Sequence, residues 1–169
     1  MEKAKDDPVD LEIIVRDEPA GHKSELRLWL RLLSTVNMIT QEIRQRLRAE
    51  FAITLPQFDL LAQLDRAREG LRMGDLSKRM MVSNGNVTGL IERLETDKLI
   101  VRDFDPVDRR VIVAKLTPLG IAKFRIYSKA HEGWLADMFA DVDPVTAKAL
   151  MKHMATMKGS VAAHLTRGA

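Results

Sequence analysis

Residues 73–116 decide the fold of this chain, and they read MGDLSKRMMVSNGNVTGLIERLETDKLIVRDFDPVDRRVIVAKL. At the start of this stretch Leu76 and Met80 lie four residues apart, and a short break follows at residues 81–83. The next apolar residues have the i, i+3, i+4, i+7 spacing of a helix that buries one stripe. They are Val87, Leu90, Ile91 and Leu94. The stretch therefore predicts two short helices joined by a tight turn.

Two strands are predicted directly after the second helix. Residues 99–104 and 110–116 are rich in β-branched side chains, and a segment containing Pro and Asp, residues 105–109, separates them. Such runs joined by a turn are typical of a β-hairpin. A helix-turn-helix followed by a hairpin forms a winged helix, whose second helix fits the major groove of DNA. Residues 71–72 either add a short third strand to this wing or remain loop.

The predicted outer face of the second helix carries small and polar residues. Gly85 and Gly89 lie one turn apart on it, and each costs about 1 kcal/mol of helix stability relative to alanine. Such a cost is expected where another molecule approaches the backbone closely. Ser83 is placed to cap the helix, amides at a helix start commonly bind phosphates, and Asn pairs well with adenine. The predicted DNA-contacting residues of this helix are Ser83, Asn84, Gly85, Asn86, Thr88, Gly89 and Arg93. An ordinary solvated helix with two tolerated glycines is the alternative.

The predicted hairpin tip adds Asp108, Arg109 and Arg110 to the DNA-binding set. Arginine at such a tip can enter a narrow minor groove, where the negative potential is strongest. We expect Asp108 to orient one of the two guanidinium groups through a bidentate pair. The alternative is a surface ion pair that contributes almost nothing to stability. The neighbouring helix-turn-helix favours the DNA-binding interpretation.

Four segments resemble the multiple-antibiotic-resistance regulator (MarR) family. They are Leu55-Pro-Gln-Phe58, the helix-turn-helix at residues 76–94, Asp105-Pro-Val-Asp-Arg-Arg110 and Leu116-Thr-Pro-Leu-Gly120. The resemblance covers about residues 24–165 and implies a dimeric, ligand-responsive transcription factor, usually a repressor. Two features depart from the family pattern. Lys98 stands where members usually have Gly, so this turn is expected to be built differently, and Met73-Gly74 gives the first helix of the pair no hydroxyl cap.

Composition and charge are consistent with this class of protein. The 169 residues suit one domain, or one domain with a dimerisation element. No apolar run approaches the roughly 20 residues of a membrane span, and the polar, acidic N-terminus does not read as a secretory signal. The absence of cysteine excludes disulfides and thiol-based oxidant sensing. We therefore expect a cytoplasmic protein without a membrane partner.

Charge is unevenly distributed along the chain. Residues 1–20 hold seven acidic side chains against three basic ones, so a charge of +7 remains on the other residues although the net charge is only +3. A basic body with an acidic arm fits a phosphate-binding protein whose arm stays away from DNA. Within the arm, residues 11–15 are apolar enough to dock, whereas residues 1–10 are expected to be disordered.

Four more helices are predicted outside the central stretch. Residues 24–50 contain no Pro or Gly, and their first half is apolar on nearly every face, which is typical of a helix buried on several faces. Caps followed by proline begin the other three helices, which run from Thr54 into a segment that Gly70 ends, from Thr117 to about residue 139 and from Asp143 to about residue 165. We expect an arm at 1–23, a helical dimerisation region at 24–52 and 118–167, and a winged helix-turn-helix lobe at 53–117. The terminal helices would intertwine with residues 24–36 of the partner.

No enzymatic or metal-binding constellation is predicted. The histidines lack the spacing of a zinc site, and no phosphate loop or nucleophile elbow occurs. They are His22, His131, His153 and His164. We therefore predict no catalytic residue, metal or cofactor.

The family resemblance implies a ligand pocket between the dimerisation helices and the DNA-binding lobe. The residues that would line it are Trp29, Arg31, Leu32, Val36, Phe58, Phe124, Tyr127 and Ser128. An aromatic wall with an arginine suits an aromatic carboxylate or its thioester, and core packing is the alternative for each residue. Residues 81–88 also resemble members that sense hydroxycinnamoyl coenzyme A (CoA) thioesters. That ligand would need cations near the pocket mouth, and the candidates are Arg16, His22, Lys23, Arg27 and Arg31.

Two other functions stay open on the sequence. One is an architectural DNA-binding protein without a ligand, which would discriminate little between DNA sequences. The other is a protein-interaction module that keeps a winged helix and binds no DNA. Steep weakening of binding by salt would argue against the second, because phosphate contacts impose it.

Overall fold

The computed structural model describes residues 24–105, 108 and 111–167. The chain falls into two compact units, Met1–His131 and Glu132–Ala169. The boundary between them lies within helix α6 (Pro118–Met138). The fold is mainly helical with one small sheet, as predicted.

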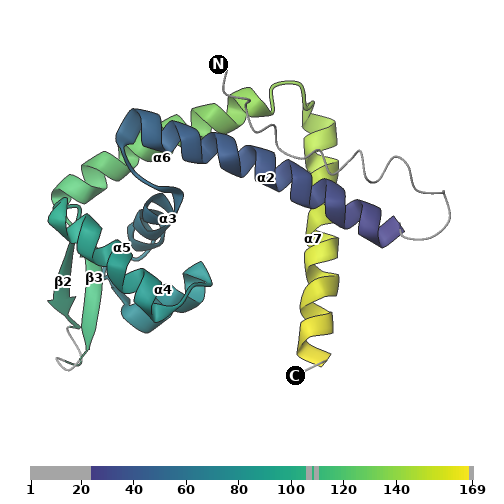
Figure 1. The fold of residues 1–169 in the computed structure, drawn as a ribbon. Coiled ribbons are helices and arrows are strands. Elements are labelled where there is room, and N and C mark those ends of the chain that lie inside the picture. The colour runs from purple at the N-terminus through teal and green to yellow at the C-terminus, as the bar shows by residue number, and fades with distance from the viewer. Residues whose placement is uncertain (1–23, 106–107, 109–110, 168–169) are drawn as a thin grey trace, which may run out of the picture. The chain divides into compact units, whose positions relative to one another are not determined.

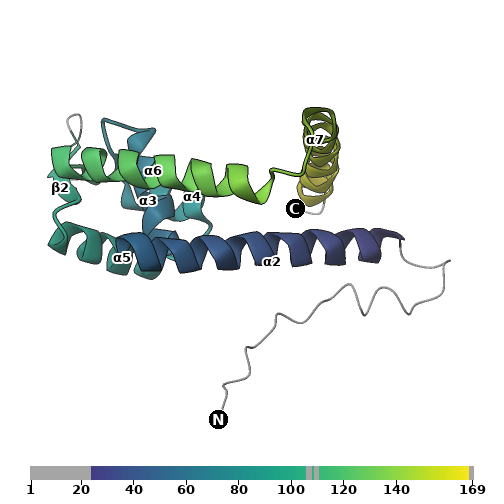
Figure 2. The same cartoon turned by 90° about the horizontal axis from the view of Figure 1, so that it is seen from above.

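The first unit contains the predicted long helix and helix-turn-helix. Its helices are α2 (Ser24–Phe51), α3 (Leu55–Asp65), α4 (Met73–Met80), α5 (Asn84–Thr96) and the first part of α6. In Figure 1, α3, α4 and α5 gather beside the strands, and Figure 2 shows the same group of helices from above. Every predicted helix in this part of the chain is confirmed.

The predicted capping box begins α3. The Oε1 atom of Gln57 accepts a hydrogen bond from the Thr54 backbone N at 2.8 Å, and the Thr54 Oγ1 accepts one from the Gln57 backbone N at 3.4 Å. The helix itself ends at Asp65, and turns lead from there to Gly70, whose φ is 97°. A Cβ on Gly70 would lie 2.9 Å from the carbonyl oxygen of Ala114, so the segment needs glycine at its end.

The wing is a three-stranded antiparallel sheet. Its strands are β1 (Leu71–Arg72), β2 (Ile100–Phe104) and β3 (Ile112–Leu116), in the order β1-β3-β2. Residues 71–72 therefore form a strand rather than a loop, and they pair with β3. One face of the sheet contributes Leu71, Ile100 and Ala114 to the core.

The core of the first unit is built from the apolar stripes predicted for its helices. On α5, Val87, Ile91 and Leu94 are fully buried and Leu90 is half-buried. The other fully buried leucines come from α2, α3 and α4: Leu47, Leu60, Leu61, Leu64 and Leu76. Burial of this stripe leaves the opposite face of α5 available for other contacts.

The turn after α5 corrects one prediction. Lys98 has φ 59°, so it adopts the left-handed conformation that glycine favours. Its backbone N donates to the Glu95 carbonyl at 2.9 Å, and the Leu99 N donates to the Leu94 carbonyl at 2.9 Å. These two bonds form a Schellman motif. The expectation that Lys98 makes a differently built turn is therefore wrong, because the lysine accepts the backbone conformation of a glycine.

Helix α6 starts directly on this turn. The Thr117 N donates to the Leu99 carbonyl at 3.0 Å, and the Thr117 Oγ1 donates to the Lys98 carbonyl at 2.7 Å. The same hydroxyl accepts from the Gly120 N at 2.9 Å, which confirms the predicted cap. A Cβ on Gly120 would lie 1.9 Å from the Leu99 carbonyl oxygen. Glycine is required here because the two backbones touch.

The second unit contains the end of α6 and helix α7 (Pro144–Arg167). The Asp143 Oδ1 accepts hydrogen bonds from the Val145 N at 2.9 Å and the Thr146 N at 3.0 Å, so the predicted cap is confirmed. The large apolar side chains of α7 that are exposed are Val145, Leu150, Met151, Met154, Val161 and Leu165. No helix in the described part of the chain has the length and apolar character needed to cross a membrane.

Candidate nucleic-acid interface

The two helices of the predicted DNA-binding motif are joined by the predicted three-residue turn. The C-cap residue of α4 is Met81, which has φ 55° and ψ 39° in the left-handed region. The Ser77 Oγ donates to the Val82 carbonyl and fastens the turn to α4. Ser83 caps α5, because its Oγ accepts from the Asn86 N at 3.4 Å. As expected, no side-chain hydrogen bond caps the start of α4, where Arg72 is the N-cap residue.

The seven predicted contact residues of α5 and its cap lie outside the buried stripe. Gly89 and Thr88 are half-buried, and the others are exposed: Ser83, Asn84, Gly85, Asn86 and Arg93. The Thr88 hydroxyl donates to the Asn84 carbonyl at 3.0 Å. Because a hydroxyl has one proton, Thr88 in this rotamer can offer only an acceptor to DNA.

The two glycines of this face are not required by the packing of the fold. A Cβ on Gly85 or on Gly89 would meet no heavy atom of the described residues within 4 Å. Gly120 is the opposite case, since a Cβ there would collide with the chain. Packing within the described part of the chain therefore does not explain why α5 keeps two glycines that weaken it.

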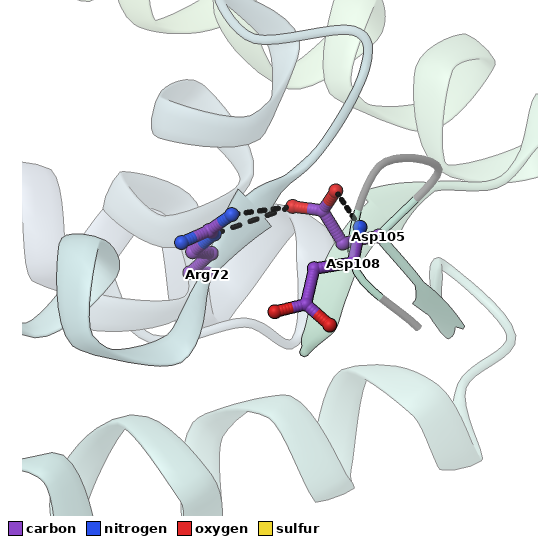
Figure 3. A network of polar contacts seen from close by, with 3 residues as sticks. All are labelled: Arg72, Asp105 and Asp108. Atoms are coloured by element: carbon purple, nitrogen blue, oxygen red, sulfur yellow. Dashed lines mark hydrogen bonds and ion pairs between the residues drawn. The ribbon is translucent and has the colours of Figure 1, made fainter. Parts of the chain in front are cut away.

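At the wing tip, Asp108 is exposed, whereas Arg109 and Arg110 lie outside the described residues. The predicted pairing of Asp108 with a tip guanidinium stays a prediction. The described contacts centre on Asp105, whose Oδ1 accepts from the Asp108 N at 3.2 Å (Figure 3). Sequence reasoning missed this role of Asp105, although Asp before Pro is a common turn starter whose side chain bonds backbone two or three residues on.

Arg102 and Lys115 of the wing each form an ion pair with a carboxylate. The Arg102 Nη2 lies 2.6 Å from the Glu95 Oε2, and this hydrogen bond lowers the pKa of Glu95 and raises that of Arg102. The Lys115 Nζ lies 3.4 Å from the Asp103 Oδ2. The pKa of Asp103 is lowered, first by the hydrogen bond from the Phe104 N and then by Lys115. These two cations already have carboxylate partners within the chain.

The predicted ligand-binding residues differ widely in burial. Phe58, Phe124 and Tyr127 are buried, and the rings of Phe58 and Phe124 lie 5.5 Å apart between centroids. By contrast, Trp29 is 57% exposed and Val36 is 55% exposed. Arg31 is also exposed, and the half-buried residues are Arg27, Leu32 and Ser128. His22 lies outside the described residues.

Two neighbours of the buried aromatic group were not predicted. Phe51 lies 4.6 Å from Tyr127 and His131 lies 4.9 Å from Phe58, measured between ring centroids. Burial raises the pKa of Tyr127, and the Asp97 charge adds to this effect. Phe51 is the last residue of α2 and lies four residues after the buried Leu47, so the helical spacing could have predicted its partial burial. Nothing in the sequence links His131 to Phe58.

The comparisons with known proteins agree with the fold. The MarR family profile matches residues 53–112. The uncharacterised helix-turn-helix (HTH)-type transcriptional regulator YsmB of Bacillus subtilis is 31% identical over 145 residues, which cover 83% of this chain and 97% of YsmB. The transcriptional activatory protein BadR of Rhodopseudomonas palustris is 35% identical over 111 residues, or 63% of each chain.

A solved structure extends the likeness over most of the chain. The crystal structure of a MarR family transcriptional regulator from Silicibacter pomeroyi superposes with a TM-score of 0.69 at 31% identity. The match covers 87% of this chain and 99% of that one. Such regulators are not enzymes. The chain therefore belongs to the MarR family of DNA-binding transcription regulators.

Proposed function

We propose that the chain is a ligand-responsive repressor that binds a palindromic operator as a homodimer, with α5 in the major groove. The observation that carries this proposal is the outer face of α5. It is polar, and it holds Gly85 and Gly89 at positions where the fold has room for a side chain. Close approach of DNA explains why this face keeps two residues that weaken the helix.

The contacts to DNA are proposed from two elements. On α5, Asn84 and Asn86 would read base edges, and the cap at Ser83 would place the first amides beside a phosphate. On the wing, Arg109 and Arg110 would enter the minor groove beside Asp108. Operator affinity should therefore fall by about 1–3 kcal/mol on Arg109→Ala.

A homodimer is supported by the apolar surface of α7. Helices with this much exposed apolar surface normally pack against a partner. Helix α2 adds Leu26, Leu28, Trp29 and Met38, each more than two-fifths exposed. We therefore propose residues 24–52 and 118–167 as the dimerisation region, with the winged lobe at 53–117 and the arm at 1–23. A symmetric pair of α5 helices about 34 Å apart would match half-sites one turn apart.

The proposed ligand is a small aromatic acid or its CoA thioester. The buried pair of Phe58 and Phe124 supports an aromatic wall. Trp29 and Arg31 are exposed, and their side-chain N–H groups would contact the ligand carboxylate. Ligand would release the operator by favouring a dimer in which the two α5 helices are wrongly spaced. The chain is proposed to act in the cytoplasm, beside the DNA it binds.

Selection of binding sites from a pool of random duplexes tests the DNA-binding proposal. We expect enrichment of a palindrome and a steep loss of affinity with rising salt, because phosphate contacts release counterions. Equal affinity for selected and random duplexes would instead indicate a ligand-independent architectural protein. Binding to neither duplex would overturn the proposal.

A thermal-shift screen tests the ligand. Benzoate, hydroxycinnamates and their CoA thioesters are added to the purified chain, and a ligand at one hundred times its dissociation constant should raise stability by about 2.7 kcal/mol. A compound that shifts the midpoint should also release the selected duplex. A midpoint that none of these compounds raises would refute the aromatic ligand and leave the DNA-binding proposal standing.

A further inference from the structure

One carboxylate fastens the turn of the wing to the helix-turn-helix. The Asp105 Oδ2 accepts hydrogen bonds from two nitrogens of Arg72, from Nε at 3.2 Å and from Nη2 at 3.0 Å (Figure 3). The other oxygen, Oδ1, accepts from the Asp108 N at 3.2 Å. The backbone N of Asp105 donates to the Val111 carbonyl at 2.8 Å. Both oxygens of this side chain therefore accept hydrogen bonds, Oδ2 from Arg72 at the start of α4 and Oδ1 from Asp108 in the wing.

The two residues of this contact belong to different elements. Arg72 is the last residue of β1 and the N-cap residue of α4, the first helix of the DNA-binding motif. Asp105 follows directly after β2, at the entry to the wing turn. They are 33 residues apart in the sequence. The contact therefore joins the end of β2 to the start of the helix-turn-helix rather than closing a local turn.

The surroundings distinguish this pair from an ordinary surface ion pair. The Asp105 side chain is only 13% exposed, while that of Arg72 is 52% exposed. A shielded carboxylate depends on its protein partners because water cannot replace them fully. The Lys115–Asp103 pair of the same hairpin differs, since its Asp103 side chain is 56% exposed and both partners belong to the sheet.

We propose that Arg72 and Asp105 are positioning residues that set the wing tip relative to α5. They would act through the tip that follows Asp105 and would not contact DNA themselves. The proposal rests on the proposed function, in which α5 and the wing bind one operator together. It predicts that operator affinity depends on a pair of side chains outside the DNA contacts.

Asp105→Asn gives the sharpest test, because the asparagine amide has one acceptor oxygen and one donor nitrogen. Either the contact with Arg72 or the contact with the Asp108 N must be lost, since a donor then faces a donor. Asp103→Asn is the matched control, which makes the same chemical change on the same hairpin away from the Arg72–Asp105 contact. Arg72→Gln removes the exposed partner of the pair. It replaces Asp105→Asn in the test if Asp105→Asn does not fold.

Affinity for the duplex selected above is measured for each variant at one salt concentration. We expect Asp105→Asn and Arg72→Gln to weaken binding about tenfold, while Asp103→Asn changes it less than about twofold. The thermal midpoint should fall modestly for Asp105→Asn and Arg72→Gln, because a shielded polar group loses a partner, and all three variants should be folded at the temperature of the binding assay. Because Arg72→Gln and Asp105→Asn both act on the contacts of one carboxylate, the double variant should lose less affinity than the sum of the two single losses.

Double variants that combine Asp105→Asn with a substitution at the wing tip distinguish a positioning role from a general loss of folding. In an Arg109→Ala background, Asp105→Asn should cause little further loss, whereas it should combine fully with Asn86→Ala on α5. Independent effects of Asp105→Asn and Arg109→Ala would overturn the proposal. So would equal affinities of Asp105→Asn and Asp103→Asn, provided that the unmodified chain binds the selected duplex. Failure of the unmodified chain to bind would overturn the proposed function itself.

Discussion

Substituting Gly120 by alanine directly tests the contact between the first turn of α6 and Leu99 in the turn that follows α5. The new Cβ would lie 1.9 Å from the Leu99 carbonyl oxygen and 2.9 Å from the Leu99 carbonyl carbon. Neither side can move freely, because the Leu99 N is bonded to the Leu94 carbonyl and the Leu99 carbonyl to the Thr117 N. The first turn of α6 must therefore shift away from the end of α5.

The expected cost follows from two contributions. Overpacking of a closely packed site costs about 1–3 kcal/mol, and each of the two Thr117 hydrogen bonds to Lys98 and Leu99 contributes about 1 kcal/mol. Gly120→Ala should thus destabilise the chain by about 3–5 kcal/mol. For a chain of this length the midpoint of thermal unfolding should fall by about 10 °C.

Gly89→Ala is the matched control for this experiment. It also replaces a helical glycine of the first unit, but its Cβ would meet nothing within 4 Å. It should raise stability by up to about 1 kcal/mol. Both variants are unfolded thermally at one protein concentration, followed by circular dichroism. An unchanged midpoint for Gly120→Ala would refute the close contact on which this reasoning depends.

Three further predictions concern the interface and the helix ends. Gly85→Ala and Gly89→Ala should each stabilise the free protein by about 1 kcal/mol yet weaken operator binding, which unfolding and duplex titration of the same samples would reveal. Lys98→Gly should raise the thermal midpoint slightly, because relief of about 1–2 kcal/mol of left-handed strain exceeds the extra entropy of an unfolded glycine; a lower midpoint would contradict this. The pKa of Asp143 is lowered, chiefly by the Thr146 hydroxyl, so its contribution to stability is present above the ordinary value of 3.8 and is lost as the pH falls through the lowered value. Asp143→Asn should flatten this acid limb of the midpoint-against-pH curve, and an unchanged limb would assign the acid sensitivity to other carboxyls.

Features encoded within a few residues could be predicted from the sequence. Thr54 and Asp143 each cap a helix because their partners follow two or three residues later, so the spacing alone identifies them. The buried stripe of α5 follows in the same way from a helical period. Local patterns of this kind were therefore sufficient to predict the fold of the DNA-binding lobe.

Features that depend on distant partners could not be predicted in this way. The pairing of Arg72 with Asp105 joins residues 33 positions apart, and no local pattern indicates it. The prediction for Lys98 was wrong because the Schellman bonds and the contacts of Thr117 hold this residue in a conformation that its own propensity disfavours. Tertiary contacts, which a single sequence does not reveal, decided both cases.

The contact at Gly120 also has a consequence for motion. Two backbones that touch and are joined by the Thr117 hydrogen bonds cannot slide past each other without breaking those bonds. The turn that follows α5 and the first turn of α6 should consequently move together. A change of direction in the first turn of α6 would then be transmitted to the turn that follows the recognition helix.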